Sequence, residues 1–192
     1  MSDPVLINLP DTLHTPRLLL RAPRAGDGPA LHQAITESLP ELREFLASLP
    51  WVAGEQSIES AETFARNAQA NFIARKDLPY LLFDKASGQL IGASGLHRTV
   101  WATPKTEVGY WCRSSMSGRG FVSEAVQALL GLAFDTLNAA RVELITDEAN
   151  AKSRSVAQRR GFVLEGTLRH ERRAPDGSLR NTCVYARLPS GT

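Results

Sequence analysis

Apolar residues recur every three or four positions in the first part of the chain, and this spacing predicts helices. We expect helices over residues 27–38, in a short piece between Pro40 and Pro50, and over residues 57–75. A short apolar strand over residues 15–21 precedes them. The early chain is therefore predicted to be mostly helical.

Beyond residue 78 the pattern changes to runs of apolar and β-branched residues separated by turn residues, which is typical of strands. One strand, helix, strand succession in this part predicts a parallel pair joined by a right-handed crossover. The fold class expected is α/β with a mixed sheet. Strands are expected over residues 79–83, 89–96, 106–113, 141–146, 162–168 and 182–188, and helices over 121–137 and 150–160.

Composition narrows the classes of function. The 192 residues fit one domain, and a net charge of +2 is too small to argue for a nucleic-acid partner. Basic residues crowd the last quarter, either as a solvated face or as a patch for phosphates or an acidic partner. Two isolated cysteines, Cys112 and Cys183, and four scattered histidines give no metal-ligand spacing. With no leader or membrane-length apolar run, we expect a cytoplasmic protein that binds no metal and no membrane.

The most informative stretch is the glycine-containing turn between the strand at 106–113 and the helix at 121–137. Gly118 and Gly120 lie in this turn, so it directs unpaired backbone N–H groups and the positive end of a helix dipole to one point. Such a point binds phosphate. The nicotinamide fingerprint would need a third glycine where Ser123 stands, and the triphosphate loop would need Gly-Lys-Ser/Thr, so both common readings are disfavoured.

Four segments together resemble the GNAT acetyltransferase superfamily, and within it the RimJ/RimL-like branch that acetylates N-terminal amines of ribosomal proteins. They are TPRLLLR (15–21), PELREFLASLPW (40–51), IGASGLH (91–97) and NAKSRSVAQRRGFVLEG (150–166). The resemblance implies a mixed sheet of about seven strands flanked by about four helices, with a splayed central parallel pair. It also implies a single domain over residues 1–192, in which residues 1–14 are an extension.

The resemblance further implies acetyl-CoA as the co-substrate. Its pyrophosphate would lie on the glycine turn, and its pantetheine arm would pair with the preceding strand. Ser117 replaces the usual Gln or Arg of the family loop, and Val122 replaces a small residue, but neither change removes a backbone donor. The implied cofactor-binding residues are Trp111, Cys112, Arg113, Ser117, Gly118, Arg119, Gly120, Phe121, Val122, Ser123, Asn150 and Ser153.

Acetyl transfer to an amine needs a neutral amine, donors for the carbonyl oxygen, and a proton for the leaving thiolate. The backbone N–H of Cys112 is the expected oxygen donor. The tyrosine that many relatives use as the acid would stand at Ala157, so Ser153 is the substitute; it could equally be an ordinary first-turn serine.

For the base the sequence offers only candidates. His97 and Glu107 are the catalytic candidates, while Glu41, Glu44 and Trp51 are expected near the acceptor. Each of them has an alternative reading as a structural or solvated residue. Cys112 as an acetylated nucleophile is disfavoured, because it lacks a paired base.

The expected function is an acetyl-CoA-dependent N-acetyltransferase that acts by direct attack in a ternary complex on a protein or peptide N-terminal amine. One alternative acceptor is a small amine, such as an aminoglycoside, a polyamine or an amino acid. Another alternative is a non-catalytic acyl-CoA sensor. The chain is expected to be a monomer or a homodimer.

Overall fold

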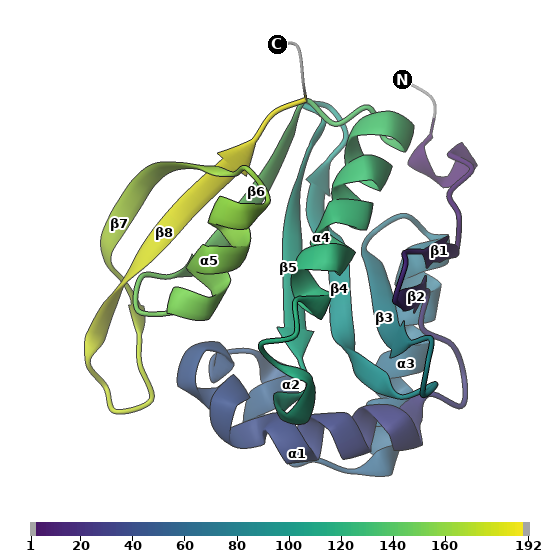
Figure 1. The fold of residues 1–192 in the computed structure, drawn as a ribbon, viewed down its shortest axis with the longest axis horizontal. Helices are drawn as coiled ribbons and strands as arrows, with labels where there is room; N and C mark the ends of the chain where they lie inside the picture. The colour runs from purple at the N-terminus through teal and green to yellow at the C-terminus, as the bar shows by residue number, and fades with distance from the viewer. Residues whose placement is uncertain (1–2, 190–192) are drawn as a thin grey trace.

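A mixed sheet organises the part of the chain that the computed structural model describes, residues 3–189 (Figure 1). Its eight strands follow the order β1-β2-β3-β4-β5-β6-β8-β7, and all neighbours are antiparallel except β5 and β6. The strands are β1 (Thr12–His14), β2 (Leu18–Arg21), β3 (Leu78–Asp84), β4 (Leu90–Val100), β5 (Lys105–Cys112), β6 (Arg141–Asp147), β7 (Val163–Arg173) and β8 (Leu179–Arg187).

Helices cover both faces of the sheet (Figure 1). One hydrophobic cluster joins α1 and α3 to Leu81, Leu90 and Trp111, and the other joins α4 to Leu96 and Val108. We call these two sides of β4 and β5 the α1 face and the α4 face. The helices are α1 (Gly28–Leu46), α2 (Pro50–Ala53), α3 (Ile58–Ile73), α4 (Phe121–Gly131) and α5 (Ala151–Arg159), with short turns η1 (Pro4–Leu6) and η2 (Ser114–Met116) and a π-helical turn η3 (Leu132–Thr136).

The parallel strands β5 and β6 separate soon after they begin. Only Lys105–Glu107 pairs with Arg141–Glu143, although β5 continues to Cys112 and β6 to Asp147. The ribbons visibly diverge beyond these pairs (Figure 1). The expected mixed sheet with a splayed parallel pair is confirmed. Among residues 3–189, no strand pairs with the β6-facing edge of β5 over its second half, and we call this the free edge of β5.

One strand of the sheet lies where no strand was expected. The sheet of the described residues has eight strands, against an expected count of about seven, because part of the expected N-terminal extension pairs with β2 as β1. The hydroxyl of Tyr80 donates to the carbonyl of Pro10 at 2.6 Å and fixes this segment. Such a short strand depends on tertiary contacts that local pattern does not display.

The expected break at Pro40 is also absent, because α1 runs through it to Leu46. Proline removes one helical hydrogen bond, to the carbonyl of Thr36. Both residues are exposed, so water can solvate that carbonyl, while Ser38 and Leu42 stay buried on the other side of the helix. The four-residue helix α2 then makes the described α-helices five rather than about four.

Candidate functional site

The glycine turn precedes α4, which begins at Phe121. Gly118 and Gly120 adopt φ values of +78° and +80°, the left-handed region that glycine tolerates best. Gly120 is the N-cap of α4, and none of the described side chains caps this end. The hydroxyl of Ser123, in the first turn, is buried and has no hydrogen-bond partner among residues 3–189. The helix therefore begins with polar groups that an anion can satisfy.

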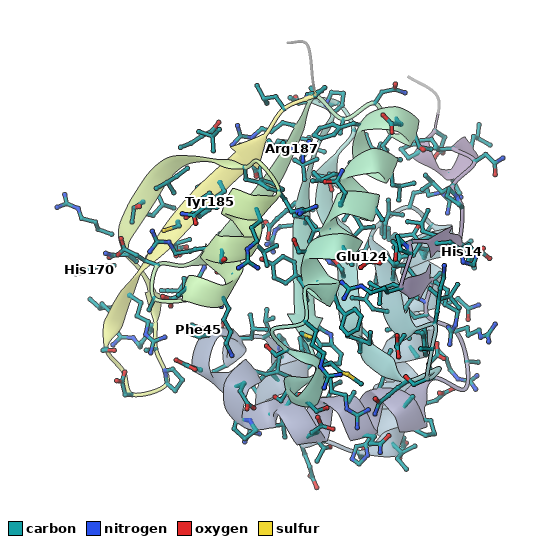
Figure 2. All side chains as sticks on the ribbon, in the orientation of Figure 1. His14, Phe45, Glu124, His170, Tyr185 and Arg187 are labelled. Atoms are coloured by element: carbon teal, nitrogen blue, oxygen red, sulfur yellow. The ribbon has the colours of Figure 1, made fainter. Side chains whose placement is uncertain are left out.

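The turn is held in place from the corner before β2. Arg17 donates to Glu124 on α4 at 2.7 Å and to the carbonyl of Arg119 at 3.0 Å. Thr15 donates to the same carboxylate at 2.6 Å. Burial opposes ionisation of Glu124, but the bonds from Thr15 and Arg17 outweigh it and lower the pKa. Figure 2 shows Glu124 on the side of α4 that faces the early strands.

The free edge of β5 leads from this turn into the gap between β5 and β6. The N–H of Arg113 donates to the carbonyl of Ile91 at 2.6 Å, so it points to β4. Backbone groups alternate in direction along a strand, so the N–H groups of Cys112 and Tyr110 point to the opposite side, where β6 has diverged. An extended ligand can pair with these groups as an added strand.

The side chains of the two residues flanking Cys112 have structural partners. The guanidinium of Arg113 is 6% exposed and bonds to Glu37 of α1 at 2.6 Å. A hydrogen bond from Ser115 and the bond from Arg113 lower the pKa of Glu37. Trp111 packs on the α1 face with its ring 5.9 Å from that of Trp51. Their side chains are thus engaged within the protein, and their backbone N–H groups point toward β4 and away from the free edge of β5.

A pair of hydroxyl groups closes the gap on the α4 face. The Oγ of Ser153, on α5, lies 2.7 Å from the phenolic oxygen of Tyr110, on β5. Asn150 caps α5 by accepting from the N–H of Ser153 at 3.0 Å. Burial raises the pKa of Tyr110 to about 12, so the phenol keeps its proton at neutral pH. Ala157, where the family resemblance led us to look for a tyrosine, is fully buried.

Sequence reasoning missed Tyr110. The alternation of side chains along β5 puts it on the same face as Val108, but the residue that it reaches belongs to a helix more than forty positions later. What marks Tyr110 is its place on β5 beyond the last residue that pairs with β6, and the end of that pairing is visible only in the tertiary structure.

His97 lies on the α1 face of β4. Its Nδ1 atom is 2.8 Å from one carboxylate oxygen of Asp77, the residue before β3, and 2.9 Å from the other. The ring lies against Gly95 and Gly109. The sequence offered His97 as a candidate, but not Asp77 as its partner.

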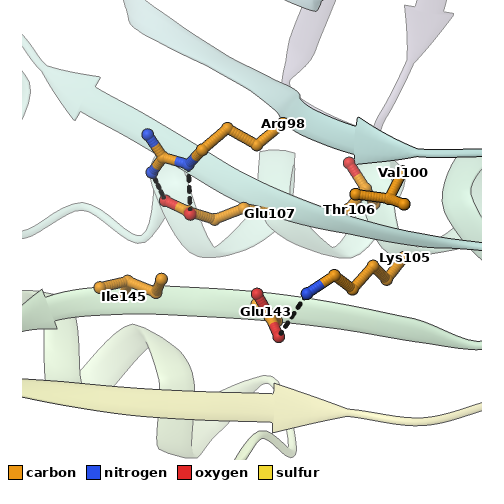
Figure 3. A pocket seen from close by; sticks show the side chains of 7 residues that line it. All are labelled: Arg98, Val100, Lys105, Thr106, Glu107, Glu143 and Ile145. Atoms are coloured by element: carbon orange, nitrogen blue, oxygen red, sulfur yellow. Dashed lines mark hydrogen bonds and ion pairs between the residues drawn. The ribbon is translucent and has the colours of Figure 1, made fainter. Parts of the chain in front are cut away.

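The other candidate base, Glu107, is already engaged. Its carboxylate accepts two hydrogen bonds from Arg98, and these bonds raise the pKa of the guanidinium (Figure 3). The pair lies in a cavity of about 300 Å³, whose other wall carries Glu143 and Ile145 of β6 (Figure 3). Both oxygens of this carboxylate are therefore engaged by one guanidinium.

The structure only partly brings together the residues expected near the acceptor amine, Trp51, Glu41 and Glu44. Trp51 contacts Trp111, but Glu41 and Glu44 are exposed. Instead, Arg180 of β8 reaches α1: it donates to the carbonyl of Glu44 at 3.2 Å and lies 5.5 Å from the ring of Phe45. Figure 2 places Phe45 on α1 at the level of the gap. Arg180 thus bridges β8 and α1.

Within residues 3–189, no group of three or more His, Cys, Asp or Glu side chains is arranged to hold a metal ion. No helix in the same part of the chain combines the length and apolar character needed to cross a membrane.

Comparison with known proteins identifies relatives. Residues 17–163 match the family model described as an acetyltransferase (GNAT) domain. The ribosomal-protein-serine acetyltransferase of Escherichia coli (strain K12) is 28% identical over 159 residues, covering 82% of this chain and 85% of that protein. YdaF of Bacillus subtilis (strain 168) is 37% identical over 89 residues, so this match spans 46% of this chain and 47% of that protein.

Among solved structures, the chain resembles RimL, a ribosomal L7/L12 α-N-protein acetyltransferase in complex with coenzyme A. The TM-score is 0.84 at 24% identity, and the match covers 93% of this chain and 97% of that chain. This likeness shows a shared fold.

The thiol of Cys112 provides a test of the site's chemistry. Burial raises the pKa of Cys112 to about 11, so at pH 8 its thiolate is scarcer than that of an ordinary cysteine by on the order of a hundredfold. Alkylation by iodoacetamide, followed by peptide mapping, should be correspondingly slow at pH 8 and should accelerate as the pH approaches 11. Rapid alkylation at pH 8 would contradict this picture and would favour a covalent acetyl-cysteine route.

Proposed function

The chain belongs to the GNAT acetyltransferase family, and on this premise we propose that it transfers an acetyl group from acetyl-CoA to a protein N-terminal amine. The observation that carries the proposal is the continuity of three features: the uncapped start of α4, the free edge of β5 and the hydroxyl pair at the gap. Both substrates are bound together, and the amine attacks directly.

The residues present fit acetyl-CoA. The uncapped helix start, two left-handed glycines and the unpartnered Ser123 hydroxyl suit a diphosphate. A Cβ placed on Gly120 would have only a distal nitrogen of Arg17 nearby, at 3.5 Å, so the approach is open and its nearest neighbour is cationic. When bound, acetyl-CoA supplies the activated thioester; the protein supplies binding and orientation.

The strand edge and the hydroxyl pair have distinct tasks in this proposal. The N–H groups of Tyr110 and Cys112 pair with the pantetheine arm and stabilise the carbonyl oxygen as it gains negative charge. Ser153 donates a hydrogen bond to the departing sulfur. The neutral phenol of Tyr110 can donate to Ser153 in turn, which leaves the serine proton free to point at the sulfur.

Of the possible acceptors, an N-terminal amine needs the least help from the site to lose its proton. Its pKa is about 7.7–8.0, against about 10.4 for lysine, so a sizeable neutral fraction exists at physiological pH. The relatives named for ribosomal-protein acetylation support the same acceptor. A small cationic acceptor has less support, because two buried carboxylates near β6 already have cationic partners: Asp147, at the end of β6, lies 3.6 Å from Arg180, and Glu107 binds Arg98.

Release of free coenzyme A thiol tests the proposed function. The protein is incubated with acetyl-CoA and either peptides with free N-termini, the same peptides with blocked N-termini, or a panel of aminoglycosides, polyamines and amino acids. Release only with free N-termini is expected. Faster release with a small amine would replace the proposed acceptor, and tight acetyl-CoA binding without release would indicate a sensor.

The substitution Gly120→Asp tests whether the glycine turn binds the diphosphate. Aspartate tolerates the left-handed conformation better than most residues, so its main effect is a negative charge against the diphosphate. The Kd for acetyl-CoA, measured by calorimetry, should rise at least about tenfold. Gly177→Asp is the matched control, because Gly177 has a φ of +85° in the β7–β8 turn and open space around it. Equal affinity in both variants would contradict the assigned loop.

Ser153→Ala and Tyr110→Phe test the hydroxyl pair. Loss of the serine hydroxyl should lower kcat by roughly tenfold to a hundredfold, because the sulfur loses its hydrogen-bond donor. The phenylalanine variant should show a smaller loss. The Kd for acetyl-CoA should change by less than about twofold in both. A parallel loss of affinity and turnover would instead assign Ser153 to cofactor binding.

A further inference from the structure

The contact between Asp77 and His97 has the geometry of an oriented imidazole. Both carboxylate oxygens lie within 2.9 Å of Nδ1. In the neutral imidazole this contact favours the tautomer with its proton on Nδ1, and Nε2 is then the nitrogen that can accept a proton. The two side chains are 30% and 35% exposed. A partly exposed pair with one free ring nitrogen can exchange protons with a ligand.

Two glycines hold the ring at one place on the sheet. A Cβ at Gly95 would lie 2.9 Å from Nε2, and a Cβ at Gly109 would lie 2.9 Å from Cδ2 and 3.2 Å from Nε2. Any larger residue at either position would collide with the imidazole. The ring therefore lies flat on the backbone of β4 and β5, beyond Glu107, the last β5 residue paired with β6.

The imidazole of His97 and the Tyr110–Ser153 hydroxyl pair lie on opposite faces of the sheet, on either side of the proposed reaction centre. Side chains alternate along β5, so His97 and Gly109 share the α1 face, while Tyr110 points to the α4 face and reaches Ser153. Gly109 and Tyr110 are consecutive. The imidazole and the hydroxyl pair thus flank the same point on the free edge of β5.

The charged groups around His97 leave Asp77 as the carboxylate that orients the imidazole. Asp77 faces it from the segment before β3, and Glu107 lies opposite it on β5. Arg98, next to His97 on β4, neutralises Glu107 through two hydrogen bonds. Of the two carboxylates, the one that contacts the imidazole is that of Asp77.

We infer that His97 is the base that accepts the proton of the acceptor amine and that Asp77 positions it; this inference rests on the proposed function. His97 Nε2 takes a proton from the acceptor's ammonium group. The freed nitrogen pair forms the bond to the acetyl carbon, the carbon–sulfur bond breaks, and its electron pair leaves on sulfur. Ser153 passes a proton to the sulfur and regains one from the amide-forming nitrogen, directly or through a water, and His97 releases its proton to solvent.

Steady-state kinetics of His97→Gln and Asp77→Asn with a free-N-terminus peptide test the inference. At pH 7, kcat/KM for the peptide should fall by about a hundredfold in the first and at least about tenfold in the second. The deficit of each variant should shrink above pH 9, where the N-terminal amine, with a pKa of about 7.7–8.0, has already lost its proton. A merely structural role would not produce this pH-dependent recovery.

Gly109→Ala is a second test of the inference, and it leaves the side chains of His97 and Asp77 in the protein. Its methyl group would displace the imidazole, so it should show the same deficit at pH 7 and the same recovery at high pH. Calorimetry should give an unchanged Kd for acetyl-CoA in the His97 and Asp77 variants. His14→Gln and Asp135→Asn, at exposed positions on β1 and η3, are matched controls that should retain wild-type kinetics.

The outcomes separate the inference from the proposed function. If wild type releases no thiol with any acceptor, the proposed function fails and the pair has no reaction to serve. If wild type acetylates the peptide but His97→Gln keeps its kcat/KM at pH 7, the inference alone is overturned. A deficit of the same size at every pH would also overturn it, since the pair would then act only on structure.

Discussion

The parallel pairing between β5 and β6 ends after three residues on each strand, and the site depends on that early end. A continuous ladder would have consumed the backbone groups of β5 and closed the sheet. Because the strands diverge, donors remain along one edge of β5, and each face of the sheet has access to the same point. The Tyr110–Ser153 contact spans the gap on one face, and Arg180 bridges β8 and α1.

In the proposed site, backbone groups carry much of the binding, and side chains hold that backbone in place. Arg17 and Glu124 fix the glycine turn from outside, and Arg113 and Glu37 fix the segment after β5 to α1. These ion pairs have partly or fully buried members, and their carboxylates remain charged because they are hydrogen-bonded. This division of labour explains why the loop can depart from its family pattern at a side chain without losing its donors.

The local features of the fold were predictable because they are written in short segments. The glycine turn, the apolar face of α4 and the strand runs each depend on neighbours within about ten residues, so pattern reveals them. The break expected at Pro40 failed for a different reason. The cost of proline depends on whether the missing hydrogen bond faces water or the core, and the sequence does not state which side of α1 is buried.

The sequence by itself determined the class of fold, the family resemblance and the position of the glycine turn before α4, because these rest on local periodicity and on contiguous motifs. Only the tertiary structure decided which partner each candidate catalytic residue has. It joined Glu107 to Arg98, His97 to Asp77 and Ser153 to Tyr110. The last two pairs are 20 and 43 positions apart, and even the Glu107–Arg98 pair required the register of β4 against β5. Pairing of this kind is set by strand order and by the divergence of β5 and β6, which no local pattern encodes.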